Sequence, residues 1–155
     1  MINDSPVTIR PTTLADIPAI LALQRQSPTS AQWTEAQYRD FASRAGPQRL
    51  MLAAESATRG LLGLLVAHPI GTEWELENIV VTPNSRRACI GRRLLTALIE
   101  RAKQSHSQTV FLEVRESNVA ARGLYEKTGF RQTGLRKSYY SNPLEDAILY
   151  RLSLR

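Results

Sequence analysis

The stretch ENIVVTPNSRRACIGRRLLTALIERA (77–102) decides the fold class of this chain. Apolar residues before Pro83 predict a strand over 73–82 that stops at the proline. After a basic loop, apolar residues recur with a period of 3.6, which predicts an amphipathic helix over 90–104. The apolar stripe of this helix consists of Ile90, Leu94, Leu95, Leu98, Ile99 and Ala102.

The loop between this strand and this helix carries four arginines within residues 86–93. A helix N-terminus offers unpaired N–H groups and a partial positive charge to an anion, and arginines add charge-assisted hydrogen bonds. The loop has neither the Gly-Lys-Ser/Thr of a Walker loop nor the G-x-G-x-x-G of a dinucleotide-binding turn. It predicts a specific phosphate site, with a solvated basic helix start or a nucleic-acid patch as the alternative.

The rest of the chain predicts a mixed fold around one sheet. Thr13 and Thr34 have the pattern of helix N-caps, and Asn118 opens a short helix that ends at Gly129. Further strands are expected at 7–10, 50–55, 61–67, 109–115, 130–139 and 147–154. We therefore expect an α/β (mixed α+β) fold that forms a single domain over residues 1–155.

Length and composition exclude several classes of protein. The chain has 155 residues, of which 43% are hydrophobic and 22% charged, so disordered and collagen-like classes are excluded. Its most apolar stretch, 61–67, is far shorter than the ~20 residues of a membrane span, and the N-terminus lacks the apolar region of a secretory signal. Cys89 is the single cysteine, so no intramolecular disulfide forms and a reducing cytoplasm is expected.

The charge is strongly positive. Twenty Lys and Arg stand against 14 Asp and Glu, which gives a net charge of +6, and 17 of the 20 cations are arginine. The guanidinium fork matches phosphate geometry, so a phosphate-bearing partner explains the excess. Codon usage that favours arginine explains it equally well.

Three blocks carry a resemblance to a known family. RRACIG (86–91) fits the pattern Q/R-x-x-G-x-G/A except that Cys89 replaces the first glycine. The other blocks are FLEVRESNVAARGLYEKTGF (111–130), and RKSYY followed by EDAILY (136–150). In this order and spacing the blocks resemble the GCN5-related N-acetyltransferase (GNAT) family, and closely its RimI-type ribosomal-protein-alanine acetyltransferases. The resemblance implies a mostly antiparallel sheet splayed at a bulge, about four flanking helices, acetyl-CoA as cosubstrate and no metal.

The resemblance also implies where acetyl-CoA binds. The loop ligands would be Arg86, Arg87, Ala88, Cys89, Ile90, Gly91 and Arg92. The backbone of Ile79, Val80 and Val81 would pair with the pantetheine and donate an N–H to the thioester carbonyl. Such a preorganised donor contributes roughly 3 kcal/mol in a transition state. Asn118 would bind CoA with its side chain, with an ordinary N-cap as the alternative, and Tyr125 would contact the cosubstrate too.

Glu113 and Tyr125 are the implied catalytic residues. An α-amino group has a pKa near ~8, so a base assists its attack on a thioester. The resemblance gives this role to Glu113; the alternative is a structural ion pair with an arginine of the neighbouring strand. A phenol with a pKa near ~10 stays protonated and can donate to the departing sulfur, which is the implied role of Tyr125. The alternative is a core tyrosine whose hydroxyl is satisfied.

The acceptor groove is the third implied feature. Trp33, Tyr139 and Tyr140 match positions that flank it, with packing at its rim as the alternative. Glu77 is also expected to bind the acceptor, because the glutamates at 73, 75 and 77 share a strand face that would attract a basic peptide. A solvated face is the alternative, and a bulge could reset the alternation of this strand.

These residues predict an enzyme that acetylates a protein N-terminus, by resemblance the N-terminal alanine of a small-subunit ribosomal protein. Other members of such a fold act on small-molecule amines or lysine side chains, which are the alternative acceptors. A non-catalytic CoA-sensing or RNA-binding module is the alternative of another class, and the intact Glu113, Asn118 and Tyr125 argue against it. Neither a membrane nor direct nucleic-acid binding is expected, and the sequence specifies no oligomeric state.

Cys89 is the departure from the family pattern. If this position requires a positive φ, a non-glycine residue costs about 1–2 kcal/mol, which would weaken CoA binding roughly ten- to thirtyfold. A thiol beside arginines and a helix N-terminus is also expected to be reactive and to form a mixed disulfide with CoA. A tolerated replacement of glycine is the alternative.

Overall fold

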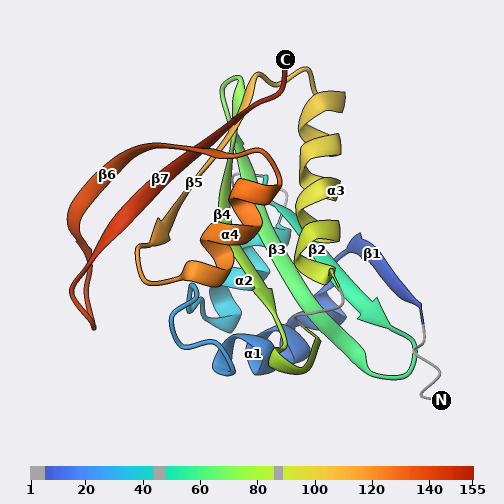
Figure 1. Cartoon of the computed structure of the whole chain (residues 1–155). Helices are drawn as coiled ribbons and strands as arrows, with labels where there is room; N and C mark the ends of the chain where they lie inside the picture. Colours follow the sequence, from blue (N-terminus) through green and yellow to red (C-terminus); the bar gives the residue numbers. More distant parts are fainter. Residues whose placement is uncertain (1–5, 44–47, 86–88) are drawn as a thin grey trace. The chain divides into compact units, whose positions relative to one another are not determined.

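The computed structural model describes residues 6–43, 48–85 and 89–155. In these ranges the chain forms seven strands and four α-helices (Figure 1). The strands are β1 (Val7–Pro11), β2 (Leu50–Ser56), β3 (Gly60–Ile70), β4 (Glu73–Val81), β5 (Thr109–Arg115), β6 (Arg131–Tyr140) and β7 (Glu145–Ser153). The helices are α1 (Ile17–Arg25), α2 (Glu35–Ala42), α3 (Ile90–Gln104) and α4 (Val119–Lys127), with short 3-10 turns at Leu14–Asp16 and Pro83–Ser85. None of the helices in the described ranges has the length and apolar content needed to cross a membrane.

Backbone pairing joins the strands in the order β1-β2-β3-β4-β5-β7-β6. The pairs β1–β2, β2–β3, β5–β7 and β6–β7 are antiparallel, whereas β4 and β5 are parallel. The parallel pairing joins 73–76 to 109–112 and extends no further, although both strands continue. The expected mixed α/β fold with a mostly antiparallel sheet is confirmed.

The chain divides into two compact units. Unit 1 contains Met1–His68 and Glu77–Leu98, and unit 2 contains Pro69–Leu76 and Ile99–Arg155. The single domain expected from the chain length stays a prediction. Strand β4 and helix α3 each contribute residues to both units.

In unit 1, helices cover both faces of β3. Leu64 and Val66 belong to a buried cluster with residues of α1 and α2, completed by Ile17, Ile20, Leu23, Tyr38, Met51 and Val80. Gly63 faces the other way, toward α3: a Cβ there would lie 3.1 Å from side-chain atoms of Ile90 and Leu94. Because successive residues of a strand point to opposite faces, α3 lies opposite the α1 cluster, and glycine allows its close approach.

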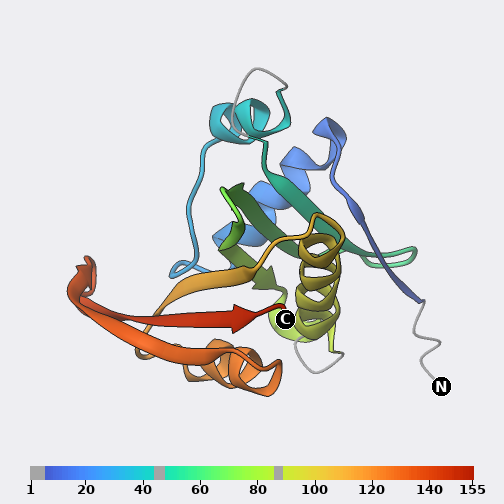
Figure 2. The same ribbon diagram turned by 90° about the horizontal axis from the view of Figure 1, so that it is seen from above.

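In unit 2, β5, β7 and β6 form an antiparallel sheet, and Figures 1 and 2 show β6 and β7 as a long hairpin. Val110, Leu112 and Val114 are buried on one face of β5, as their alternation predicts. Asn118 caps α4 and its Oδ1 accepts the Ala121 N–H at 3.2 Å. Gly129 follows the helix with a φ of 104°, which confirms the predicted glycine end of α4.

Predicted and observed element bounds differ mainly at the ends. The predicted helix after Thr13 begins with a 3-10 turn and becomes α1 only at Ile17. Strand β3 continues to Ile70, beyond the predicted 67, and β7 begins at Glu145, where this residue pairs with Tyr140. Pairing with a neighbouring strand extends these elements past the point where their apolar pattern ends.

Candidate active site

The start of α3 has the backbone that the predicted phosphate loop requires. Cys89 is exposed and has a φ of 58°, so the expected positive φ is confirmed. Its carbonyl accepts the Arg93 N–H at 3.0 Å, which makes it the residue where the helical hydrogen bonds begin. Arg86, Arg87 and Ala88 lie outside the described residues.

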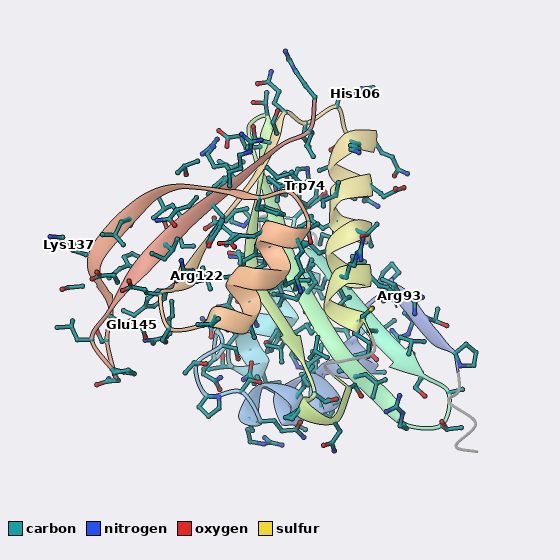
Figure 3. The ribbon with its side chains drawn as sticks, viewed as in Figure 1. Trp74, Arg93, His106, Arg122, Lys137 and Glu145 are labelled. Atoms are coloured by element: carbon teal, nitrogen blue, oxygen red, sulfur yellow. The ribbon has the colours of Figure 1, made fainter. Side chains whose placement is uncertain are left out.

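The other loop residues differ in what they can offer a ligand. The side chain of Ile90 is fully buried beneath Gly63, so only its backbone is available at the helix start. Gly91 is half-buried in the first turn, and Arg92 and Arg93 are exposed there. Figure 3 shows Arg93 at this end of α3. Together they give an anion exposed backbone and two guanidinium groups.

The side chains of β4 contact residues of β3 in unit 1. Val66 and His68 share one face of β3, because its pairing with β2 is regular through Ala67. Glu77 Oε1 lies 3.3 Å from His68 Nδ1, and Val80 packs in the same cluster as Val66. Both residues therefore have neighbours on β3, although burial alternates regularly along β4 from 73 to 81. The bulge that would reset this alternation stays a prediction.

Residues 78–81 continue the alternating burial of β4. The Val80 side chain is 4% exposed and belongs to the core, whereas Ile79 and Val81 are half-buried. Asn78 is 7% exposed, and its Nδ2 has no hydrogen-bond partner among the described residues. A buried amide without a partner costs free energy, and such groups concentrate at functional positions. Any contact of Val80 with a ligand must therefore come from its backbone.

Glu113 lies on β5 and is paired with an arginine. Its Oε1 is 3.1 Å from Arg136 Nε, with 18% of the glutamate side chain exposed and 55% of the arginine. The charge of Glu113 is also the largest cause that raises the pKa of Tyr139, because it opposes the phenolate. Burial and then the charge of Glu113 raise the pKa of Tyr140 to about 12. The carboxylate thus lies among one guanidinium and two protonated phenols.

Tyr125 is a buried phenol in α4. It is 5% exposed, and burial raises its pKa above the ordinary value, with a further contribution from Tyr140. Its ring packs 5.8 Å from Phe130 and 6.0 Å from Tyr150, measured between ring centroids. No residue in the described ranges accepts a hydrogen bond from its hydroxyl, and the choice between a core tyrosine and a proton donor stays a prediction.

The end of the β6–β7 hairpin is held in place around these groups. Arg115, on β5, stacks 4.4 Å from the Tyr140 ring and reaches Glu145 at 3.3 Å. Tyr139 is half exposed and meets Tyr140 edge to face at 5.1 Å. Unit 2 therefore brings Glu113, Tyr139 and Tyr140 together, with Tyr140 as the neighbour shared by Glu113 and Tyr125.

Two of the expected acceptor-binding residues lie in unit 1. Trp33 packs against the α1 cluster and contacts Tyr38 and Phe41 edge to face, so it has the packing role given as its alternative. Glu77 pairs with Arg49 at 2.7 Å, with 14% of its side chain exposed. Glu73 pairs with Arg151 in unit 2. Arginines distant in sequence thus pair with Glu73 and Glu77, and both the acceptor-binding and the solvated-face interpretations of these glutamates stay predictions.

Sequence reasoning missed Arg136, Arg115 and Arg49, the arginines that contact the candidate residues. Arg136 stands in the quoted block RKSYY, yet it received no role because its contact depends on how β6 pairs with β7. The sequence allows an arginine partner for Glu113 but does not identify which arginine it is. Chemically, unit 2 offers a carboxylate and a buried phenol donor, and unit 1 offers a helix N-terminus and the backbone of residues 79–81.

Comparison with known proteins gives the same picture. The model of the Acetyltransferase (GNAT) family matches residues 17–130. A relative from Escherichia coli (strain K12), named ribosomal protein bS18-alanine N-acetyltransferase, is 32% identical over 149 residues, 95% of this chain and 97% of the relative. The crystal structure of the ribosomal-protein-S18-alanine N-acetyltransferase from Escherichia coli superposes with a TM-score of 0.81 at 31% identity, covering 96% and 94% of the two chains. Arabidopsis thaliana NAA60 in complex with a bisubstrate analogue has the same fold, with a TM-score of 0.86 at 16% identity over 96% and 98%.

Proposed function

This chain belongs to the acetyltransferase (GNAT) family and is an N-acetyltransferase, and we propose that its acceptor is the α-amine of a protein N-terminus. The Escherichia coli relative is named for the alanine of ribosomal protein bS18, so the acceptor proposed here is the N-terminal alanine of that small-subunit protein. Such an acceptor is made in the cytoplasm, which is the proposed location of the enzyme. No metal is proposed.

Acetyl-CoA is the proposed acetyl donor, bound through unit 1. Its phosphates would meet the start of α3, where Cys89 turns the backbone and Gly91 and Arg92 follow. The pantetheine would pair with the backbone of 79–81, because the parallel pairing of β4 with β5 ends at Leu76. Asn118 would add a contact while it caps α4.

Glu113 is the proposed general base. It takes a proton from the acceptor ammonium, directly or through a water molecule, and the neutral nitrogen then attacks the thioester carbonyl. The nitrogen–carbon bond forms, the nitrogen loses its second proton to solvent, and the carbon–sulfur bond of the tetrahedral intermediate then breaks. Glu113 releases the proton that it took to solvent. The support for this role is that the Glu113 carboxylate is partly exposed beside Tyr139 and Tyr140, residues proposed to hold the acceptor.

Tyr125 is the proposed general acid, and its environment is the observation that carries the proposal. A buried phenol with a raised pKa stays protonated through the neutral range, and its hydroxyl has no acceptor in the described part of the chain. It is therefore a free donor for the sulfur of CoA as the carbon–sulfur bond breaks. The Tyr125 phenol then recovers a proton from solvent, and the products are the acetylated N-terminus and CoA.

The test incubates the purified protein with acetyl-CoA and peptides that start with Ala, Ser, Gly or Met, plus a blocked peptide with an internal lysine. Mass spectrometry should find acetyl on the Ala-starting α-amine.

Glu113→Gln and Tyr125→Phe should each lower kcat by about 10²- to 10⁴-fold, the range of general acid–base catalysis. Glu116→Gln removes an exposed carboxylate three residues away and should stay close to wild type. Transfer only to lysine would replace the proposed acceptor, and full activity of both variants would refute the assigned roles.

A further inference from the structure

Arg136 forms an ion pair with Glu113, the carboxylate that is the proposed general base. Its Nε lies 3.1 Å from Glu113 Oε1, the closest approach of a cation to this glutamate among the described residues. Its guanidinium also lies 5.4 Å from the ring of Tyr139. One side chain thus covers both the proposed base and a residue of the proposed acceptor groove.

The conformation of β6 creates this contact. Arg136 pairs with Ala147 and Tyr140 with Glu145, so residues 137–139 stand opposite Asp146 alone. Ser138 has a φ of 51°, and its N–H donates to Asp146 Oδ1 at 2.7 Å. In a regular strand, Arg136 and Tyr139 would point to opposite faces. The extra residues turn both toward Glu113.

We propose that Arg136 occupies the place at Glu113 that the ammonium group of the acceptor takes in the reaction, so that the acceptor binds by exchanging one cation for the other. This inference rests on the proposed function. Glu113 presents one charge to two cations, and the guanidinium already contacts one of its two oxygens, Oε1. The exchange leaves the carboxylate with one cation partner before the acceptor binds and with another once it is bound.

The contact is suited to exchange because it is easily broken. More than half of the Arg136 side chain is exposed, against 18% of the Glu113 side chain, so water can solvate the guanidinium when it leaves the pair. The Tyr139 ring offers the displaced guanidinium a second partner by a cation–π contact. An acetylated N-terminus carries no charge, so the return of Arg136 to Glu113 favours release of the product.

Steady-state kinetics with the Ala-starting peptide test the exchange. In Arg136→Gln the acceptor has no competitor at Glu113, so its KM should fall two- to fivefold, the equilibrium effect of losing one exposed ion pair. The kcat should stay within twofold, because the groups that react are untouched. Arg136→Lys keeps a competing cation and should restore a KM near wild type.

Lys137→Gln is the matched control. Lys137 is the exposed neighbour of Arg136 on β6, labelled in Figure 3, and its substitution removes the same charge without touching Glu113. Its KM should not fall. An unchanged or higher KM in Arg136→Gln, or a tenfold loss of kcat, would overturn the exchange, as would an equal fall of KM in Lys137→Gln. No transfer by wild type or any variant would instead refute the proposed function, and the exchange with it.

Discussion

Cys89 has a backbone conformation that glycine adopts without steric cost. Its φ of 58° brings the Cβ close to the following carbonyl, which costs about 1–2 kcal/mol. Because the folded chain itself has this conformation, the strain lowers the free energy of unfolding. Cys89→Gly removes this strain, but glycine also gives the unfolded chain more conformational entropy, which offsets part of the gain. The net effect should be a rise of about 0.5–1 kcal/mol in the free energy of unfolding, measured by urea denaturation.

Cys89→Ala separates the backbone from the thiol in that experiment. Alanine keeps the strain and should change stability by less than about 0.5 kcal/mol, because the side chain is exposed. Calorimetry of acetyl-CoA binding should give similar Kd values for all three proteins. A Kd that falls ten- to thirtyfold in Cys89→Gly alone would place the strain in the binding step, as the sequence suggested.

Asp16 should contribute stability that depends on pH. Hydrogen bonds from Arg10, at 2.8 Å, are the largest cause that lowers the pKa of this carboxyl to about 2 from 3.8. A group with a depressed pKa stabilises the fold above its ordinary pKa and loses that contribution as the pH falls through the folded value. Asp16→Asn should therefore cost about 1–2 kcal/mol between pH 5 and 7, and progressively less from pH 4 toward 2.

Urea unfolding at several pH values measures this difference. Glu35→Gln is the control, because Glu35 pairs with Arg39 one helical turn away and both side chains are more than half exposed. Its cost should be a few tenths of a kcal/mol. A constant cost of Asp16→Asn from pH 7 to 3 would show that the Arg10 contact does not set the stability.

Helix α4, which carries Tyr125, is tied to β7 by one buried hydroxyl. Tyr150 is 0% exposed, donates to Glu126 Oε1 at 2.7 Å and accepts from Arg122 Nε at 3.1 Å. Figure 3 shows Arg122 on this helix. Tyr150→Phe keeps the ring beside Tyr125 but removes both bonds to charged groups. It should lower the free energy of unfolding by about 1–3 kcal/mol and speed amide exchange in α4.

Tyr38→Phe gives the matched comparison. Its hydroxyl is also buried, but it donates to the neutral Gln24 Oε1, at 2.7 Å. The cost should be about 0.5–1.5 kcal/mol, since hydrogen bonds between neutral groups contribute less. Equal costs for the two variants, or unchanged exchange in α4, would mean that the charged ends of the Tyr150 contact add nothing.

Helices and strands whose apolar residues recur with a clear period were predictable from the sequence. The side-chain contacts between residues distant in sequence were not. The stripe of α3 and the alternation of β5 are local patterns, and Asn118 and Thr34 cap helices as their residue types favour. The positive φ at Cys89 followed from the family pattern. The pairing of Arg136 with Glu113 could not be predicted, because it depends on extra residues in β6 that no local signal marks. The contact of Arg49 with Glu77 joins residues 28 apart, and charge alone selects no partner among 17 arginines.

Binding of acetyl-CoA should stabilise the chain as a whole, because a ligand that binds only the folded state shifts the unfolding equilibrium. At a free concentration 100 times its Kd it adds about 2.7 kcal/mol, which for a chain of this length raises Tm by roughly 5–10 °C. Differential scanning fluorimetry measures the shift.

Adenosine 3′,5′-bisphosphate carries phosphates without pantetheine, and at the same concentration it should give a smaller shift, since it lacks the proposed contacts with 79–81. Glu113→Gln should retain the full acetyl-CoA shift, because its carboxylate acts on the acceptor. Equal shifts from both ligands would remove β4 from the proposed site, and no shift at all would contradict acetyl-CoA as the donor.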